Sequence, residues 1–247
     1  VIGSFLNVCI HRLPRKESLV WPGSHCPSCG RALTAPELVP VVSYLALRGR
    51  CRSCGFRIPA RYPAVELLSG LAFYWAASTA ADPADFLRAA LFLSGLIVVF
   101  FVDLRHGVIP DAVALPLLAA GLGLSVVAGG AVFMDRLAAA ATGFLLFWLI
   151  YIVGSWLLKK EAMGGGDLKL AAMMGAYLGM RLLAAGLFIG FAIGAAVSVW
   201  LLATKRKQRK DTVPFGPMLA AGGALAFVKG EAIINWYGEL MTKLWFS

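Results

Sequence analysis

Two short motifs place an aspartate beside an apolar run of the sequence. Asp103 lies in VDLRHGVIPD, which follows LFLSGLIVVFF, and Asp167 lies in GGGDLKL, which precedes AAMMGAYLGM. A charged side chain at the edge of a membrane segment costs free energy, so it is expected to have a function. Two carboxylates that share a proton can activate water against a peptide carbonyl, one as base and the other as acid. This is the chemistry of aspartic proteases, and Asp103 and Asp167 are the candidate catalytic pair.

The same acids also have structural interpretations. Asp103 could form an ion pair with Arg105 at the end of its helix. Asp167 could be the N-terminal charge of its own helix, with Lys169 extending toward the headgroups. Asp111 could place a favourable negative charge in the first turn of the next helix. From the residues alone, catalytic and structural roles for Asp103 and Asp167 are equally favoured, and a proton-coupled transporter would also use such acids.

Three glycines, Gly164, Gly165 and Gly166, precede Asp167 directly. Without side chains they would let backbone or substrate approach closely, and they permit the φ values of a tight turn into a helix. The histidines form no close cluster in the sequence, and HExxH and GxSxG motifs are absent. A histidine-based metal hydrolase is therefore disfavoured.

The composition indicates which kind of secondary structure holds these residues. Hydrophobic residues make up 60% of the 247 residues, charged residues only 15%, and the mean hydropathy is +0.78. These values indicate an integral membrane protein. Continuous apolar runs without period-2 alternation predict helices rather than a barrel. The predicted segments are 64–81, 86–102, 108–128, 137–158, 168–180, 182–203 and 213–228.

The opening VIGSFLNVCI is apolar but covers only about half of a membrane span, which needs roughly 20 residues. We expect it to be the end of a first helix whose start lies upstream. The predicted fold is therefore an all-α polytopic membrane protein with about eight transmembrane helices, the first truncated here.

The formal net charge of +10 is distributed unevenly along the chain. Of 23 Lys and Arg residues, nine lie from Arg12 to Arg61 and five lie in KRKQRK at 205–210. This distribution follows the positive-inside rule if 11–62 is cytoplasmic, and it favours membrane orientation over nucleic-acid binding. The same alternation puts Asp103 and Asp167 at the cytoplasmic ends of their helices, where they could meet.

The polar segment 11–62 carries CPSCG and CRSCG, two CxxC pairs. Cys26, Cys29, Cys51 and Cys54 can converge as four thiolates on one structural zinc ion, which would supply much of the folding energy of so short a domain. Two disulfides are the alternative, disfavoured by a reducing cytoplasm. Four Cys ligands leave no open position for catalysis. Cys9 is interpreted as a small packing residue.

Several motifs, in this order, resemble the type IV prepilin peptidases, or prepilin leader peptidase/N-methyltransferases. They are GSFLNVCIHRLP, CPSCG, LRGRCRSCG, RYPAVE, VDLRHGVIPD, GGGDLKL and PFGPMLAAGG, and GGGDLKL is similar to the GxGD signature of intramembrane aspartyl proteases. The resemblance implies that Asp103 and Asp167 are catalytic and that prepilin or pseudopilin precursors are the substrates. It also implies removal of a short basic leader on the cytoplasmic side of the bacterial inner membrane, and N-methylation from S-adenosylmethionine.

We therefore predict four parts: 1–10, the end of the first helix; 11–62, a zinc-ribbon-like cytoplasmic domain; 63–229, the protease domain; and 230–247, an interfacial tail. The alternative function is a zinc-anchored scaffold for pilus or type II secretion assembly, in which the acids only pair with Arg105 and Lys169. A transporter is disfavoured because the acids lie near helix ends rather than at the middle of the bilayer.

Overall fold

The computed structural model describes residues 2–161, 163–205 and 213–246. Within these residues the regular structure is helical, and the extended pairing is limited to two isolated bridges, His25 with Ala32 and Arg50 with Arg57. The predicted all-α fold is confirmed. The chain divides into two compact units, Val1–Val98 (unit 1) and Val99–Ser247 (unit 2).

Unit 1 contains two packed helices and a polar segment between them. Its elements are α1 (Ile2–Arg12), η1 (Leu13–Arg15), η2 (Ala35–Leu38), α2 (Val42–Ala46), α3 (Arg61–Thr79) and the first part of α4 (Pro83–His106). Asn7 of α1 donates to the carbonyl of Tyr62 at 3.1 Å, and Ser4 donates to Glu66 at 2.7 Å. A side chain on Gly3 would lie 2.8 Å from the Glu66 Cα, so glycine allows α1 and α3 to approach closely.

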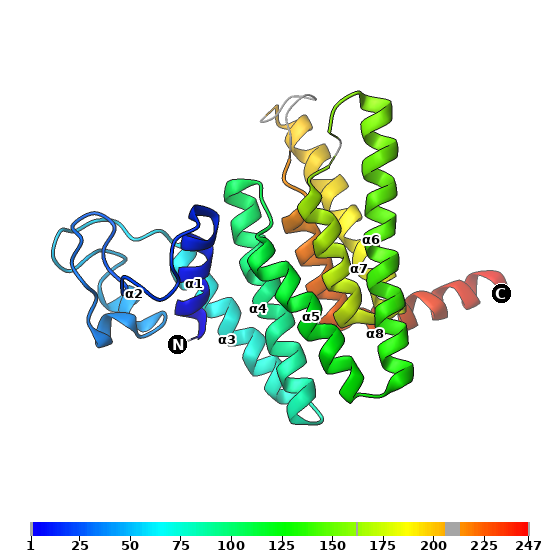
Figure 1. Ribbon diagram of the computed structural model, residues 1–247, viewed down its shortest axis with the longest axis horizontal. Coiled ribbons are helices and arrows are strands. Elements are labelled where there is room, and N and C mark those ends of the chain that lie inside the picture. Colours follow the sequence, from blue (N-terminus) through cyan, green and yellow to red (C-terminus); the bar gives the residue numbers. More distant parts are fainter. Residues whose placement is uncertain (1, 162, 206–212, 247) are drawn as a thin grey trace. The chain divides into compact units, whose positions relative to one another are not determined.

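Unit 2 is a helical bundle with α7 at its centre. Its further helices are α5 (Asp111–Val127), α6 (Gly130–Leu158), α7 (Gly165–Ala203) and α8 (Gly216–Phe246), and α7 packs against the other three (Figure 1). A Cβ on Gly175 would lie 2.5 Å from the backbone of Ala139, and one on Gly222 would lie 2.5 Å from the nitrogen of Gly190. Small residues thus permit close helix packing, as in other membrane bundles.

Helix α7 is interrupted at Gly179, whose φ is 73° and ψ 176°. The backbone N–H of Met180, directly after the break, donates to the Asp135 carboxylate of α6 at 3.3 Å. The carboxylate therefore satisfies a backbone group that the interruption leaves without a helical acceptor. This break separates the two segments predicted at 168–180 and 182–203.

Four described helices are long and apolar enough to cross a membrane: Pro83–His106, Gly130–Leu157, Gly165–Ala203 and Gly216–Lys243. Helix α5 is apolar but shorter. The predicted polytopic helical membrane protein is confirmed, and helices cover most of each predicted apolar segment. A total of eight spans stays a prediction.

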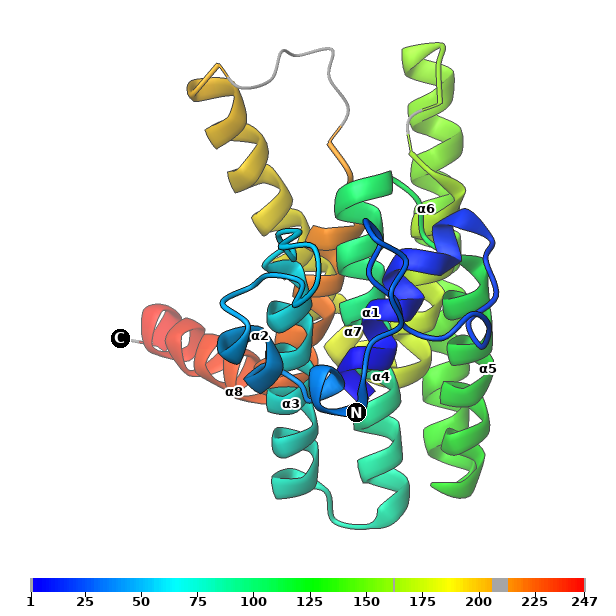
Figure 2. The ribbon, with the colours of Figure 1, turned by 90° about the vertical axis from the view of Figure 1, so that its left-hand side faces the viewer.

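The C-terminal part of α8 extends away from the other helices of unit 2 (Figure 2). Trp236 and Tyr237 are exposed there, as is expected if this part contacts a membrane interface. The basic run KRKQRK at 205–210 lies mostly outside the described residues.

Candidate functional site

Unit 2 brings the two candidate aspartates together. Asp103 lies in the last turn of α4 and Asp167 in the first turn of α7. Both are buried, with 5% and 8% of their surface exposed. They lie near enough for the charge of one to act on the other. Two segments 64 residues apart in the sequence (103 to 167) thus present two acids to one site.

The start of α8 packs closely against Asp103. A Cβ on Gly216 would lie 2.5 Å from Oδ2 of Asp103 and 3.2 Å from Cδ1 of Ile109. The backbone N–H of Gly216 also lies against the Asp103 carboxylate as a hydrogen-bond donor. Because Gly216 has no side chain, the first turn of α8 can approach the acid directly.

The three glycines before Asp167 differ in their surroundings. None of them has a positive φ, so the turn into α7 does not depend on glycine's access to left-handed conformations. A Cβ on Gly166 would lie 2.8 Å from Cβ of Ile109, and one on Gly164 would lie 3.7 Å from Oδ2 of Asp167, while Gly165 has open space around it. Close packing on Ile109 explains Gly166, whereas a side chain at Gly165 would meet nothing within 4 Å.

The ion pairs predicted for a purely structural role are not formed by the described residues. Lys169 pairs with Asp111 at 2.6 Å, not with Asp167. Neither Asp103 nor Asp167 forms a salt bridge with a described Lys or Arg, Arg105 included. The arrangement that the scaffold hypothesis needs is therefore not favoured.

The polar segment of unit 1 contains a candidate metal centre. The Sγ atoms of Cys26, Cys29, Cys51 and Cys54 all lie within 4.8 Å of one another, and the five cysteines of the chain are free thiols. Cys26 and Cys54 Sγ are 3.8 Å apart. Four thiolates bound tetrahedrally at about 2.3 Å from one ion would be roughly 3.8 Å apart, so this donor set could hold a metal ion.

Both CxxC turns have the same hydrogen bonds. Cys26 N–H donates to the carbonyl of Arg31 and Cys51 N–H to that of Phe56, each at 2.9 Å. Gly30 and Gly55 donate back to the carbonyls of Cys26 and Cys51, at 2.9 and 3.0 Å, with φ of 70° and 69°. Glycine is favoured where φ is positive, which explains CxxCG in both copies. These turns direct both sulfurs of each pair inward.

Local donors prepare one thiol of the cluster to ionise. The backbone N–H groups of Cys54 and Ser53 lower the pKa of Cys51 to about 6. At Cys29 the N–H of Arg31 acts in the same direction, but desolvation and the neighbouring sulfurs outweigh it and raise the pKa to about 11. Four adjacent thiols cannot all ionise without a cation, and a bound metal ion would supply that charge.

Two residues of the aspartate site, Gly216 and Ile109, were not predicted as site residues. Gly216 lies in PFGPM and Ile109 in GVIPD, both motifs that the sequence singled out. The signal was therefore present in the motifs, but apolar residues and glycines give no chemical indication of which acid they will contact.

The fold and these two centres define a class: polytopic helical membrane enzymes with a four-cysteine polar segment. A profile described as the bacterial peptidase A24 N-terminal domain matches residues 1–80, and that of the type IV leader peptidase family matches residues 90–199. The chain belongs to this family of peptidases.

Curated relatives match over nearly the whole chain. A prepilin leader peptidase/N-methyltransferase of Aeromonas hydrophila is 37% identical over 261 residues, which cover 96% of this chain and 90% of that protein. One of Bacillus subtilis is 36% identical over 240 residues, 96% and 94% of the two chains. No solved structure matches significantly.

Proposed function

We propose that this protein is an intramembrane aspartyl endopeptidase that removes the short basic leader from prepilin-like precursors. Asp103 and Asp167 form its catalytic pair. One observation carries the proposal: two buried carboxylates from α4 and α7 lie within electrostatic reach and form no salt bridge among the described residues. The names of the relatives, prepilin leader peptidase/N-methyltransferase, support the substrate class.

In this mechanism one carboxyl is ionised and the other protonated, because like charges held close do not both ionise easily. The carboxylate takes a proton from a water molecule, whose oxygen attacks the peptide carbonyl carbon. The protonated carboxyl donates to the carbonyl oxygen. When the tetrahedral intermediate collapses, the C–N bond breaks and the leaving amine receives a proton from the pair.

Cleavage of a pilin-like precursor in detergent or membranes tests the catalytic assignment. Wild type is compared with Asp103→Asn and Asp167→Asn, and the new N-terminus is identified by mass. Only the wild type should cleave. Undiminished cleavage by either variant would contradict the assignment, and binding without cleavage by the wild type would favour the scaffold alternative.

We further propose that the new N-terminal amine is methylated by the same protein. S-adenosylmethionine would supply a methyl group on a positively charged sulfur, which a neutral amine can accept. The Aeromonas and Bacillus relatives carry N-methyltransferase in their names, which supports this second activity. A cleaved product heavier by one methyl group would confirm it, and an unmodified product in the presence of the donor would contradict it.

Zinc is the metal that we propose for the four-cysteine cluster, with a structural role. The spacing of Cys26 and Cys54 suits tetrahedral thiolate ligation, and four thiolates leave no position for a reacting water. We also propose that residues 11–62 face the cytoplasm and that the membrane helices lie in the bacterial inner membrane. The excess of basic residues in this segment supports that orientation.

A further inference from the structure

The link between α4 and α5 carries an apolar side chain that meets both halves of the aspartate site. A Cβ on Gly166, which precedes Asp167, would lie 2.8 Å from Cβ and 3.4 Å from Cδ1 of Ile109. A Cβ on Gly216, which lies against Asp103, would lie 3.2 Å from the same Cδ1. The side chain of Ile109 therefore lies between the residue before one acid and the residue that touches the other.

This link is short, and its backbone is held at both ends. Four residues connect the end of α4 to the start of α5. At one end the N–H of Gly107, whose φ is 65°, donates to the carbonyl of Asp103 at 2.8 Å. At the other end the carbonyl of Pro110 accepts from the N–H of Ala114 at 3.1 Å. Because branching at Cβ also restricts χ1, Ile109 projects from this backbone in a defined direction.

An aromatic cluster holds the start of α8 in place. The ring centroid of Phe215 lies 5.1 Å from that of Phe191 in α7 and 6.3 Å from that of Phe147 in α6. A Cβ on Gly194 would lie 3.0 Å from Cε2 of Phe215, so this ring is seated directly on α7. Gly216 is the next residue along the chain, and the cluster therefore fixes the backbone on which Ile109 packs.

The first turn of α7 is held by burial. Gly166 lies in this turn, and the next two residues, Asp167 and Leu168, are each 8% exposed, while Leu170 is fully buried. Ile109 thus packs against two backbone segments that other contacts fix. Closely packed interiors respond to the loss of even one methylene group. A shorter side chain at this position would leave room for either segment to shift, and each segment carries or contacts one of the acids.

We propose that Ile109 is a positioning residue of the cleavage reaction, whose side chain sets the separation of Asp103 and Asp167. The inference rests on the endopeptidase function proposed above. Two carboxyls can share a proton and activate one water molecule only when they are held close together. Ile109 has no group that exchanges a proton, so it acts on the reaction through the two glycines. A residue that only stabilised the fold would change thermal unfolding and leave the turnover of the folded protein unchanged.

Removal of a single methyl group tests this role. Ile109→Val lacks Cδ1, the atom that faces both glycines, and retains the branch at Cβ. With a pilin-like precursor in detergent, kcat should fall about tenfold and KM should stay within about twofold, because displaced catalytic groups slow the chemical step. Ile109→Ala should lower kcat about a hundredfold, the loss expected for a displacement of about 1 Å. A wild-type kcat in Ile109→Ala would overturn the proposal.

Two further variants separate positioning from general packing. Ile152→Val makes the same chemical change in α6, where Ile152 is 42% exposed, and should keep the kcat of the wild type. Ile109→Leu retains the number of carbon atoms and should cleave faster than Ile109→Ala. Thermal unfolding of each variant checks that it folds. Equal losses of kcat in Ile109→Val and Ile152→Val would overturn the positioning role, as would a raised KM with unchanged kcat in Ile109→Val.

The aspartate variants, measured beside these, separate two kinds of failure. If Asp103→Asn or Asp167→Asn cleaves as the wild type does, the endopeptidase assignment fails and the role of Ile109 fails with it. If the wild type cleaves, both aspartate variants are inactive and the Ile109 variants match the wild type, only the positioning role is contradicted.

Discussion

Gly216 and Asp103 approach so closely that a single methyl group on the glycine would lie 2.5 Å from Oδ2 of the carboxylate. The contact joins the start of α8 to the end of α4 and brings a backbone N–H to the acid. Because real Cβ atoms do not approach neighbouring atoms so closely, either the helix or the carboxylate would have to move to admit a side chain.

Gly216→Ala should lower the rate of precursor cleavage by about a hundredfold, because catalytic groups displaced by about 1 Å lose that much. The matched control is Gly123→Ala in α5, where an added Cβ would meet nothing within 4 Å. Both variants are assayed for cleavage and for thermal unfolding. Equal rates for the two variants would show that the position of Asp103 does not depend on this contact.

Asp103→Asn and Asp167→Asn should each reduce cleavage on the order of a thousandfold or more, because neither amide can exchange the proton that the pair shares. Asp85→Asn, at the other end of α4, is the control, since Asp85 pairs only weakly with Arg88 at 3.4 Å. Rates are measured with the same precursor and helix content by circular dichroism. Loss of helix in the two variants would instead indicate that the acids are needed for folding.

Lys169→Met should have a small effect, because its partner Asp111 is exposed and such surface pairs contribute at most about 1 kcal/mol. Cleavage should fall by less than tenfold, in contrast to the change at Asp167 two residues earlier. A double-mutant cycle with Asp111→Asn measures the coupling through thermal unfolding. A loss of activity as large as that of Asp167→Asn would give Lys169 a direct role in the reaction.

Removal of the metal should loosen unit 1. We expect about one zinc ion per purified chain, bound by four thiolates. Cys29→Ser should lower the metal content and make 11–62 sensitive to limited proteolysis, because the metal supplies much of the folding energy of a small domain. Cys9→Ala, outside the cluster, should keep the metal. Metal analysis of both proteins checks this, and a full zinc content in Cys29→Ser would contradict four-cysteine ligation.

The carboxylate of Glu37 should make the stability of the fold depend on pH. The N–H of Thr34, the pairing with Arg31 and the hydroxyl of Thr34 lower its pKa from 4.5 to about 2. A lowered folded-state pKa stabilises the fold above pH 4.5, and this contribution is lost as the pH falls toward 2. In thermal unfolding, the Glu37→Gln variant should therefore be less stable than the wild type at pH 7. This difference in stability should close as the pH falls below about 4.5. A constant difference would exclude the carboxylate as the cause.

The sequence alone was sufficient for the helical membrane fold and for the cysteine cluster. Long apolar runs must form helices in a bilayer because every backbone polar group needs an internal partner. The CxxCG pairs likewise contain their own turn chemistry, and the structure brings Cys26, Cys29, Cys51 and Cys54 together as predicted. Both signals are local, so they do not depend on how the helices pack.

The surroundings of the two aspartates were decided only by tertiary structure. The sequence could not show that Lys169 pairs with Asp111 rather than with Asp167, because that choice depends on how α5 packs against α7. The conformational reason first given for Gly164 to Gly166 is not needed either, since their φ values are ordinary and Gly166 instead packs on Ile109.

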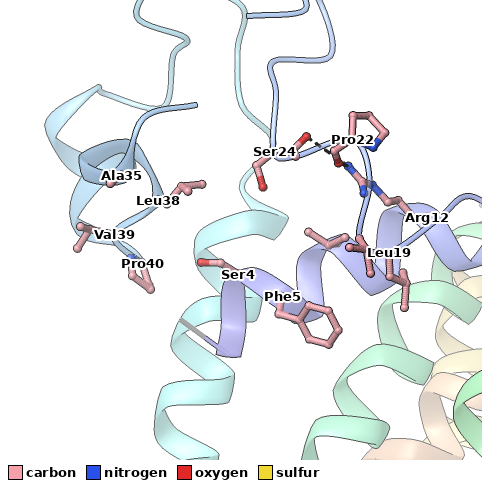
Figure 3. Close-up of a pocket in the computed structure, with 13 residues that line it drawn as sticks. Ser4, Phe5, Arg12, Leu19, Pro22, Ser24, Ala35, Leu38, Val39 and Pro40 are labelled. Carbon is pink, nitrogen blue, oxygen red and sulfur yellow. Dashed lines mark hydrogen bonds between the residues drawn. The ribbon is translucent and has the colours of Figure 1, made fainter. Parts of the chain in front are cut away.

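The reactive side chains of this protein are recognisable from its sequence, because composition and motif are properties of the chain alone. Tertiary structure decided which neighbours touch them. Gly216 meets Asp103 across more than a hundred residues of sequence, and a cavity within unit 1 is lined by α1 together with segments 19–24 and 35–40 (Figure 3). Close packing of helices creates such contacts, and no local pattern of residues specifies them.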